Sequence, residues 1–301
     1  MKIPWKISIN QKSLADIAAQ RAKNKNSNLF NKVIELNNKS NFMGVEEPGV
    51  ALVTGASAGI GEEYAKQLAN QGFDLILTAR RKERLDSLAE KLADKHGIKI
   101  EVIQGDLFES SDVEKISAHI KTINNLDCLI NNAGFGTDVN FLDGNSDINL
   151  FINMLNLHCK VPMQFAHAAL PAMIKRDRGH IANISSVASL LFHGYQDPIY
   201  DSTKTFLSVF SEVIQLKLNV MKSKVKVKAI CPGWTVTEIH DKLKNFDRSP
   251  YVWMNVDEVV KIALDSYKSD DIIVITGEVN VQRVLKSRKE AREIPGRYFY
   301  F

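Results

Sequence analysis

Tyr200 and Lys204 stand four residues apart in a segment whose apolar residues recur at helical spacing. On a helix, residues i and i+4 lie one above the other on the same face. An ammonium group beside a phenol stabilises the phenolate, so Lys204 is expected to lower the pKa of Tyr200 from its ordinary value near ~10. Tyr200 is therefore a candidate general acid and base, although a pair of this spacing can equally be an exposed pair on a helix surface.

A second candidate is a glycine-rich turn that follows the apolar run Val50 to Thr54 and precedes a helical pattern. Its glycines are spaced G-x-x-x-G-x-G. Glycines allow the backbone to approach a diphosphate closely, and the free N–H groups at the start of a helix attract its charge. The residues expected to contact a dinucleotide here are Gly55, Ser57, Gly59, Ile60 and Gly61.

Arg80 follows the next apolar run, residues 74–79, at the place where a dinucleotide fold that prefers NAD usually carries an acidic residue. A guanidinium at this place attracts the 2′-phosphate of NADP through charge-assisted hydrogen bonds. The sequence therefore favours NADP(H) as the cofactor. The alternative is that Arg80 and Arg81 simply begin a basic helix, which agrees poorly with the helix dipole.

The elements that must position these residues alternate along the chain. Expected helices cover residues 82–96 and 110–122, and expected strands cover residues 99–103 and 127–130. Strands separated by helices form a parallel sheet. We predict an α/β fold of Rossmann type, with a doubly wound parallel sheet and helices on both faces in a single domain. Ligands bind such sheets at the carboxyl ends of the strands, where the candidate residues occur.

The chain resembles the short-chain dehydrogenase/reductase family in five motifs, which occur in the order that is usual for the family. They are T-G-x-x-x-G-x-G at Thr54 to Gly61, N-N-A-G at Asn131 to Gly134, Ile184-Ser185-Ser186, Y-x-x-x-K at Tyr200 to Lys204, and Cys231-Pro232-Gly233. The resemblance covers residues 48–276. Residues 1–47 are expected to form a polar N-terminal extension, and residues 277–301 a basic and aromatic C-terminal extension.

The resemblance implies a role for each matching residue. Tyr200 would be the acid and base, Lys204 would hold the nicotinamide ribose, and Ser186 would hydrogen-bond the substrate oxygen. Asn156 matches the asparagine that the family uses in a proton relay, whereas His158 is expected to be a packed residue. The further cofactor contacts that the resemblance implies are Asp106, Leu107, Asn132, Ala133, Gly134, Pro232, Gly233, Thr235 and Thr237.

Three positions depart from the pattern of the family, one of which is Thr235, where a branched apolar residue is usual. Ser186 precedes Tyr200 by fourteen positions, one more than the commonest spacing. If the extra residue lies in the intervening loop, the site is intact; Ser185 would point the other way, because neighbours on a strand face opposite sides. Ala58 stands where many NADP-preferring members carry a basic residue, so binding of the 2′-phosphate would depend on Arg80, with Arg81 as a second candidate.

The reaction implied is hydride transfer between NADP(H) and a carbonyl or alcohol, with reduction of an apolar ketone, aldehyde or acyl-type substrate favoured. Apolar residues in the loop 238–253 suit such a substrate. One alternative is an NAD-linked alcohol dehydrogenase, against which Arg80 argues. The other is a non-catalytic regulatory protein that binds the cofactor, against which the presence of Tyr200, Lys204 and Ser186 argues.

Composition narrows the remaining classes. The chain of 301 residues has a formal net charge of only +4, which gives no reason to expect a nucleic-acid partner. No apolar run approaches the roughly 18 residues of a membrane helix. Cys128, Cys159 and Cys231 are expected to be reduced thiols, and no pair of histidines or cysteines has the spacing of a metal site. These features favour a cytoplasmic protein.

Two segments predict contacts with other subunits: the helix expected over residues 199–221 and the aromatic C-terminal tail. The helix expected over residues 199–221 is apolar on more than one face, and in the family that the chain resembles the second face usually meets another subunit. We therefore expect a homodimer or homotetramer. The four consecutive aromatic residues at 298–301 are expected to dock on the body or on a partner subunit, in preference to a membrane surface.

Overall fold

A computed structural model of the chain describes residues 42–45, 47–137, 139–191, 197–238 and 251–291. The chain divides into two units, Met1–Glu46 and Glu47–Phe301, and the second contains the sheet and its helices. Most of the extension expected over residues 1–47, most of the loop expected over the substrate and the aromatic tail lie outside the described residues.

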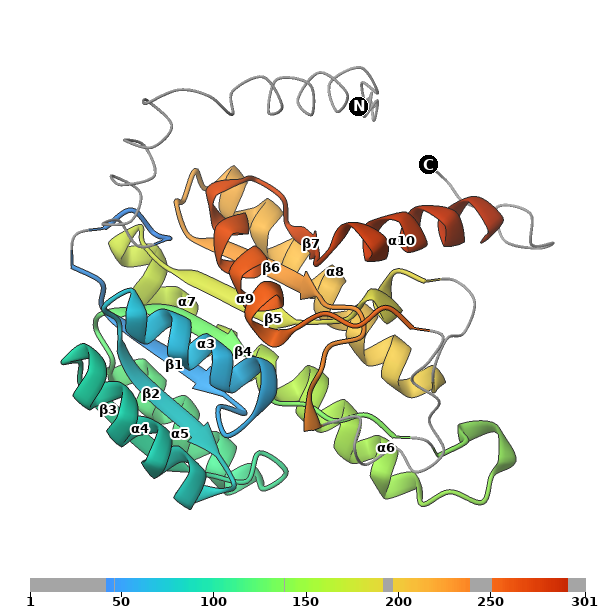
Figure 1. Ribbon diagram of the computed structural model, residues 1–301, viewed down its shortest axis with the longest axis horizontal. Coiled ribbons are helices and arrows are strands. Elements are labelled where there is room, and N and C mark those ends of the chain that lie inside the picture. Colours follow the sequence, from blue (N-terminus) through green and yellow to red (C-terminus); the bar gives the residue numbers. More distant parts are fainter. Residues whose placement is uncertain (1–41, 46, 138, 192–196, 239–250, 292–301) are drawn as a thin grey trace. The chain divides into compact units, whose positions relative to one another are not determined.

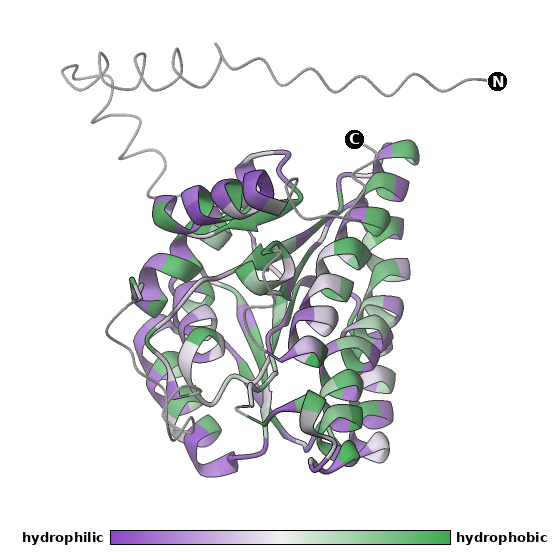
Figure 2. Ribbon diagram, turned by 90° about the vertical axis from the view of Figure 1, so that its right-hand side faces the viewer, coloured by the Kyte–Doolittle hydropathy of each residue, from purple (hydrophilic) through white to green (hydrophobic). Residues whose placement is uncertain are grey.

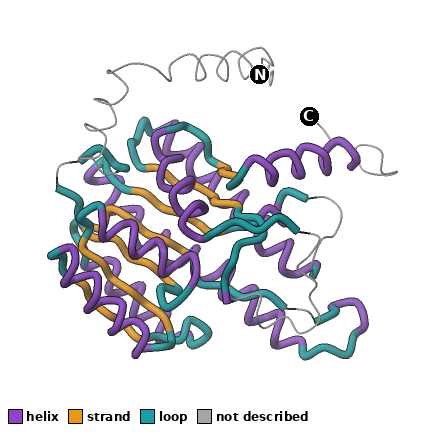
Figure 3. Tube along the Cα trace, viewed as in Figure 1, coloured by secondary structure: helices purple, strands orange, loops and turns teal. Residues whose placement is uncertain are grey.

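Seven parallel strands form one sheet with the order β3-β2-β1-β4-β5-β6-β7 (Figures 1 and 3). The strands are β1 (Val50–Thr54), β2 (Asp74–Ala79), β3 (Ile100–Gln104), β4 (Leu126–Asn131), β5 (His180–Ile184), β6 (Lys226–Cys231) and β7 (Ile273–Ile275). In β1, Val53 pairs with Leu77 of β2 on one side and with Ile130 of β4 on the other. The chain therefore changes direction beside β1, and a crevice for ligands is expected at such a switch point.

Helices cover both faces of the sheet, as the sequence predicts (Figure 2). α3 packs against α4 and α9 on one face, and α5 packs against α7 on the other. The helices are α3 (Gly59–Asn70), α4 (Lys82–His96), α5 (Ser110–Thr122), α6 (Ile148–Leu155), α7 (Val161–Arg176), α8 (Pro198–Val220), α9 (Val256–Asp265) and α10 (Glu278–Ala291). The doubly wound α/β fold is thus confirmed.

The core lies between the sheet and these helices. Leu52, Leu129 and Ile181 project from three neighbouring strands and are fully buried against Phe165 and Met173 of α7. Each fully buried side chain of this size contributes roughly 1.5 to 3 kcal/mol relative to its exposed state. The carboxyl ends of the strands are thereby held as a rigid platform for the loops that follow them.

Asp197 caps the start of α8. The side chain of Asp197 accepts hydrogen bonds from the backbone N–H groups of Ile199 (2.7 Å) and Tyr200 (3.4 Å). Pro198 occupies the first turn, where its missing N–H costs nothing. Tyr200 is consequently held in the first turn of α8, directly behind the cap.

The long helix expected after the N-N-A-G motif is interrupted. Between α6 and α7 the chain forms a π-turn, η2 (Asn156–Lys160). Pro162 accounts for part of the interruption, because it lacks the N–H that would bond the carbonyl of His158 in a regular helix. Single π-turns of this kind are frequent at functional sites, because the extra residue turns a side chain to a new direction.

The C-terminal helix α10 belongs to the same unit as the sheet. Its Val284 packs with Cys231 of β6 and with Val187 in one buried cluster. The side chain of Asn280 lies so close to Gly233 that a Cβ there would meet it at 2.2 Å. The part of residues 277–301 that the structure describes therefore supports a loop of the expected site. Within the described part of the chain, no helix is long and apolar enough to cross a membrane.

Candidate active site

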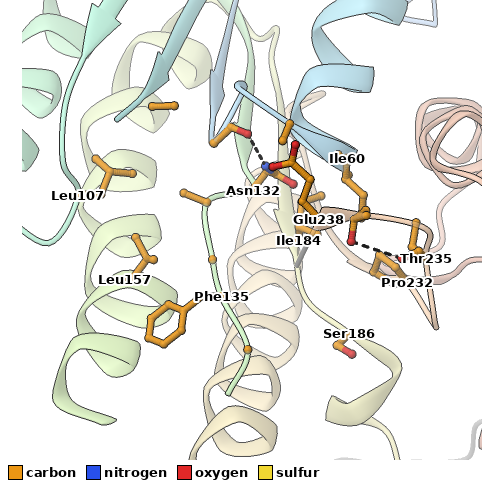
Figure 4. A pocket seen from close by; sticks show the side chains of 18 of the residues that line it. Ile60, Leu107, Asn132, Phe135, Leu157, Ile184, Ser186, Pro232, Thr235 and Glu238 are labelled. Carbon is orange, nitrogen blue, oxygen red and sulfur yellow. Dashed lines mark hydrogen bonds between the residues drawn. The ribbon is translucent and has the colours of Figure 1, made fainter. Parts of the chain in front are cut away.

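A cavity of about 640 Å³ lies at the carboxyl ends of the strands, beside β1 (Figure 4). Leu107, Leu157 and Phe135 form one side of it, and Ile60 and Thr235 lie on the other (Figure 4). The residues predicted from the sequence that line it are Gly55, Ser57, Gly59, Ile60, Arg80, Asp106, Leu107, Asn132, Ala133, Gly134, Ser186, Tyr200, Lys204, Pro232, Gly233, Thr235 and Thr237. Segments distant in sequence thus meet around one cavity.

The glycine turn has the backbone that only glycine adopts without strain. Gly55 has a φ of 66° and Gly59 a φ of 56°. Gly61 is buried and does not line the cavity, but a Cβ there would lie 2.4 Å from the oxygen of Gly55 and 2.4 Å from Nδ2 of Asn132. Its absence of a side chain lets α3 approach the loop after β4. Ala58, which precedes α3, supplies no side-chain cap, so the first N–H groups of α3 face the cavity.

Thr54 joins the ends of β1 and β4. Its Oγ1 accepts the backbone N–H groups of Asn132 (2.9 Å) and Ala133 (3.0 Å) and donates to the carbonyl of Ile130 (3.2 Å). The side chain of Asn132 in turn donates to the carbonyl of Thr54 (2.9 Å). This closed set of hydrogen bonds fixes the N-N-A-G loop on the glycine turn.

The two serines after β5 point in different directions, as neighbours on a strand must. Ser185 is buried, and its hydroxyl donates to the carbonyl of Lys204 (2.7 Å). Ser186 also lines the cavity, where its hydroxyl accepts from the backbone N–H of Ala188 (3.2 Å). Both serines line the cavity, but the hydroxyl of Ser185 is directed to the backbone of α8 and to Ser208, so Ser186 remains the serine predicted to contact the substrate oxygen.

Tyr200 and Lys204 lie together, but the expected lowering of the pKa is wrong. Burial raises the pKa of Tyr200 to about 12, against the smaller opposing effect of its hydrogen bond with Ser186. The ammonium of Lys204 lies 5.6 Å from the centre of the Tyr200 ring and donates to the carbonyl of Ile184 (2.9 Å). Burial also lowers the pKa of Lys204 to about 8, because a charged ammonium loses its hydration. The phenol is therefore protonated at neutral pH.

Asn156, predicted as a relay residue, is not brought to the site. It begins the π-turn and does not line the cavity. His158 lies against the site instead: its ring is 5.8 Å from the Tyr200 ring, and Nε2 accepts the N–H of Phe135 (3.1 Å). A signal in the sequence was available, because Met154, His158 and Val161 recur at the spacing of a buried helix face from which Asn156 is excluded.

The basic end of the cavity contains Arg80, Arg81 and also Glu238, an acidic residue that the sequence did not place beside the arginines. Arg80 lies over the ring of Phe108, with its guanidinium carbon 5.5 Å from the ring centre. Arg81 turns to the glycine turn, where Nε donates to the hydroxyl of Ser57 (3.2 Å). Arg81 also pairs with Glu238 (2.8 Å), which lines the cavity. No local pattern connects Arg81 with Glu238, since only the fold brings β2 and the loop after β6 together.

The end of the cavity near Ser186 is largely apolar. Leu157, Phe135 and Trp234 line it. The Trp234 ring packs on Tyr251 and on Trp253, with ring centres 4.5 Å and 5.4 Å apart. Of these three rings, that of Trp234 lines the cavity, and the other two pack on it from outside the lining. The residues between Glu238 and Tyr251 lie outside the described part of the chain.

Known proteins share both the sequence and the fold. A family model described as "short chain dehydrogenase" matches residues 49–248. The chain is 33% identical over 211 residues to the very-long-chain 3-oxoacyl-CoA reductase of Anas platyrhynchos, an alignment that covers 66% of this chain and 64% of that relative. It is 30% identical over 232 residues to an uncharacterized oxidoreductase of Staphylococcus aureus, covering 75% of this chain and 95% of the relative.

Solved structures agree with these relatives. A short-chain dehydrogenase from Sphingobium yanoikuyae in complex with NADPH is 29% identical, with a TM-score of 0.71 over 84% of this chain and 99% of that one. A bulky-bulky ketone specific alcohol dehydrogenase from Comamonas testosteroni is 27% identical, with a TM-score of 0.68 over 85% of this chain and 98% of that one. The fold and the site define an oxidoreductase of Rossmann type. The chain belongs to the short-chain dehydrogenase family.

Proposed function

We propose that this oxidoreductase reduces an apolar ketone or 3-oxoacyl-type carbonyl to the alcohol with NADPH. The observation that carries the proposal is the single cavity that holds the Tyr200 phenol and the Ser186 hydroxyl at an apolar end and arginines at the other. Relatives named for 3-oxoacyl-CoA and for bulky ketones support the substrate class. The Trp234 ring in the cavity lining supports it further, because apolar groups bind by removal of apolar surface from water.

The residues of the cavity fit a dinucleotide phosphate. The uncapped start of α3 and the glycine turn offer N–H donors to a diphosphate. Arg80 and Arg81 line the far end, where the 2′-phosphate of NADP would need cations. In the described cavity lining, the acidic residues are Glu238 and Asp106. Bound NADPH supplies the hydride.

The chain's own residues supply the proton and hold the carbonyl. Tyr200 is protonated at neutral pH because burial raises its pKa to about 12, and it donates this proton to the substrate oxygen. Ser186 donates a hydrogen bond to the same oxygen as negative charge develops on it. Lys204 holds its ammonium behind Tyr200 through the carbonyl of Ile184 and stabilises the phenolate that remains.

A substrate panel tests the proposal. Consumption of NADPH is measured with 3-oxoacyl thioesters of different chain length, with bulky apolar ketones, and with small polar ketoses as the control class. We expect kcat/KM to rise with apolar size and to be lowest for the ketoses. Equal or better turnover of the ketoses would contradict the apolar substrate class, and NADH-dependent turnover above that with NADPH would contradict the cofactor.

We also propose that the protein acts in the cytoplasm as a homodimer or homotetramer through α8. Exposed apolar side chains recur on α8 at intervals of three and four residues, which places them on one face. They are Phe206, Val209, Val213, Leu216 and Val220. A helix face of this kind is typical of a contact between subunits, because its exposure to water is unfavourable.

A further inference from the structure

His158 joins two parts of the site that come from different elements. Its Nε2 accepts the backbone N–H of Phe135 (3.1 Å), in the loop after β4. Its Nδ1 lies 3.0 Å from Oγ1 of Thr203 on α8. The ring is buried, with only 1% of its surface exposed. Both ring nitrogens are therefore occupied by groups of the protein.

These contacts determine which nitrogen carries the proton. The N–H of Phe135 can only donate, so Nε2 must be the unprotonated acceptor. The hydroxyl of Thr203 donates its hydrogen to the carbonyl of Tyr200 (2.8 Å), so it accepts from His158, and Nδ1 carries the proton. The result is a continuous chain from Phe135 through His158 and Thr203 to the backbone of Tyr200. Burial, and the nearby charge of Lys204, hold the pKa of His158 well below its usual range, which keeps the ring neutral.

The His158 ring is closely packed on several sides. A Cβ at Gly134 would lie 2.9 Å from Nε2 of His158, so the loop approaches the ring as closely as glycine allows. The His158 ring also meets the rings of Phe135 and Tyr200 edge-on or tilted, with centres 5.7 Å and 5.8 Å apart. The π-turn that contains His158 brings it to this place, at which Asn156 does not arrive.

We propose that His158 is a positioning residue that sets the loop Asn132 to Phe135 and the first turn of α8 relative to each other, and thereby sets Tyr200 relative to the bound cofactor. This inference rests on the proposed function. The two hydrogen bonds have separable effects. The bond to Phe135 positions the loop Asn132 to Phe135, which lines the cavity and includes predicted cofactor contacts, whereas the bond to Thr203 positions the proton donor.

Two substitutions separate these bonds. The amide of His158→Gln reaches the place of Nε2 and keeps the acceptor for Phe135 but loses the donor to Thr203. The amide of His158→Asn reaches the place of Nδ1 and keeps the donor but loses the acceptor. We expect His158→Gln to lower kcat about tenfold with little change in the Kd of NADPH, and His158→Asn to weaken NADPH about tenfold with a smaller change in kcat. Thr203→Val should reproduce the loss of kcat, and its effect should not add to that of His158→Gln.

Two measurements keep the test independent of activity. Nitrogen NMR of the histidine rings in the full chain should show His158 as the neutral Nδ1–H form at neutral pH. Titration of NADPH gives the Kd without any substrate. His180→Gln is the matched control: His180 is also buried but begins β5 at the opposite end of the strand from the cavity, so its replacement should change the thermal midpoint without separating kcat from Kd.

The outcomes distinguish the inference from the proposed function. Equal losses of kcat and of NADPH affinity in His158→Gln and His158→Asn, in proportion to the thermal midpoint, would overturn the positioning role, as would an Nε2–H form in the NMR spectrum. If either variant fails to fold, Thr203→Val and the NMR spectrum of the wild type still decide. A wild type that binds NADPH but reduces no carbonyl would contradict the proposed function. The difference in the Kd of NADPH between His158→Gln and His158→Asn would still test the role of His158.

Discussion

The carboxylate of Glu238 lies 2.8 Å from the guanidinium of Arg81, although the two residues are far apart in the sequence. Glu238 pairs with Arg84 as well, at 2.5 Å, and its hydrogen bonds to both arginines lower its pKa to about 2. Glu238 is thus ionised throughout the neutral range. An anion of the protein therefore already pairs with Arg81 at the basic end of the cavity, whereas Arg80 lies over the ring of Phe108.

Replacement of Glu238 should increase the preference for NADPH. In Glu238→Gln the arginines lose their internal anion, so we expect NADPH to bind about two- to fivefold more tightly and NADH to be unaffected, as exposed ion pairs are worth only about 0.2 to 1 kcal/mol. The measurement is a titration of both cofactors. Lys82→Gln, which breaks the neighbouring pair with Asp86, is the control. Equal changes for NADPH and NADH would show that Glu238 does not compete for a 2′-phosphate.

The fold was predictable because its signals are local. The apolar run Val50–Thr54 and the helix that follows the glycine turn each lie within a few residues of their signals, and each is found as expected. The site was less predictable where a contact depends on distant segments. The pairing of Arg81 with Glu238 has no local sign, and no local pattern predicts the π-turn that contains both Asn156 and His158.

The direction of a pKa could not be predicted from residue types either. Lys204 was expected to lower the pKa of Tyr200, but the balance depends on how far the phenol and the ammonium are removed from water. Burial is a property of the whole fold, since α8, β5 and the loop after β4 together cover the pair. A pattern of two residues carries no information on it.

The buried charge of Lys204 should lower the free energy of unfolding. Burial lowers its pKa from 10.5 to about 8, so the unfolded chain binds more protons between these values and the charged form destabilises the fold below pH 8. Lys204→Met should therefore raise the free energy of unfolding by about 1 to 3 kcal/mol at neutral pH. The gain is reduced because the carbonyl of Ile184 loses its hydrogen bond from Lys204. Denaturant unfolding of the wild type and the variant measures this difference.

The pH dependence provides the check on this account. The advantage of Lys204→Met should be complete below about pH 8 and should shrink as the pH approaches 10.5, because the wild-type lysine then becomes neutral in both states. A difference that stays constant over this range would mean that the charge of Lys204 does not cause it. Lys204→Met should also lose turnover, since the charge behind Tyr200 is gone.

Subunit association should depend on the exposed face of α8. Val213→Glu places a charge in the middle of that face and should shift the protein towards the monomer, because a carboxylate in an apolar contact is costly to dehydrate. Light scattering of the full chain measures the mass. Lys91→Glu on α4 introduces the same group at an exposed position on the other face of the sheet and should leave the mass unchanged. A wild type that is monomeric at all concentrations would contradict the proposed assembly.

The most direct test of the reductase account is the pair of measurements on Tyr200→Phe. The substitution removes one hydroxyl group, keeps the ring that packs against His158, and leaves the cofactor end of the cavity unchanged. We predict that the variant binds NADPH with nearly the wild-type Kd and loses at least about a hundredfold in kcat on a carbonyl that the wild type reduces, the lower end of what a positioned proton donor contributes. Wild-type kcat in Tyr200→Phe would contradict the account.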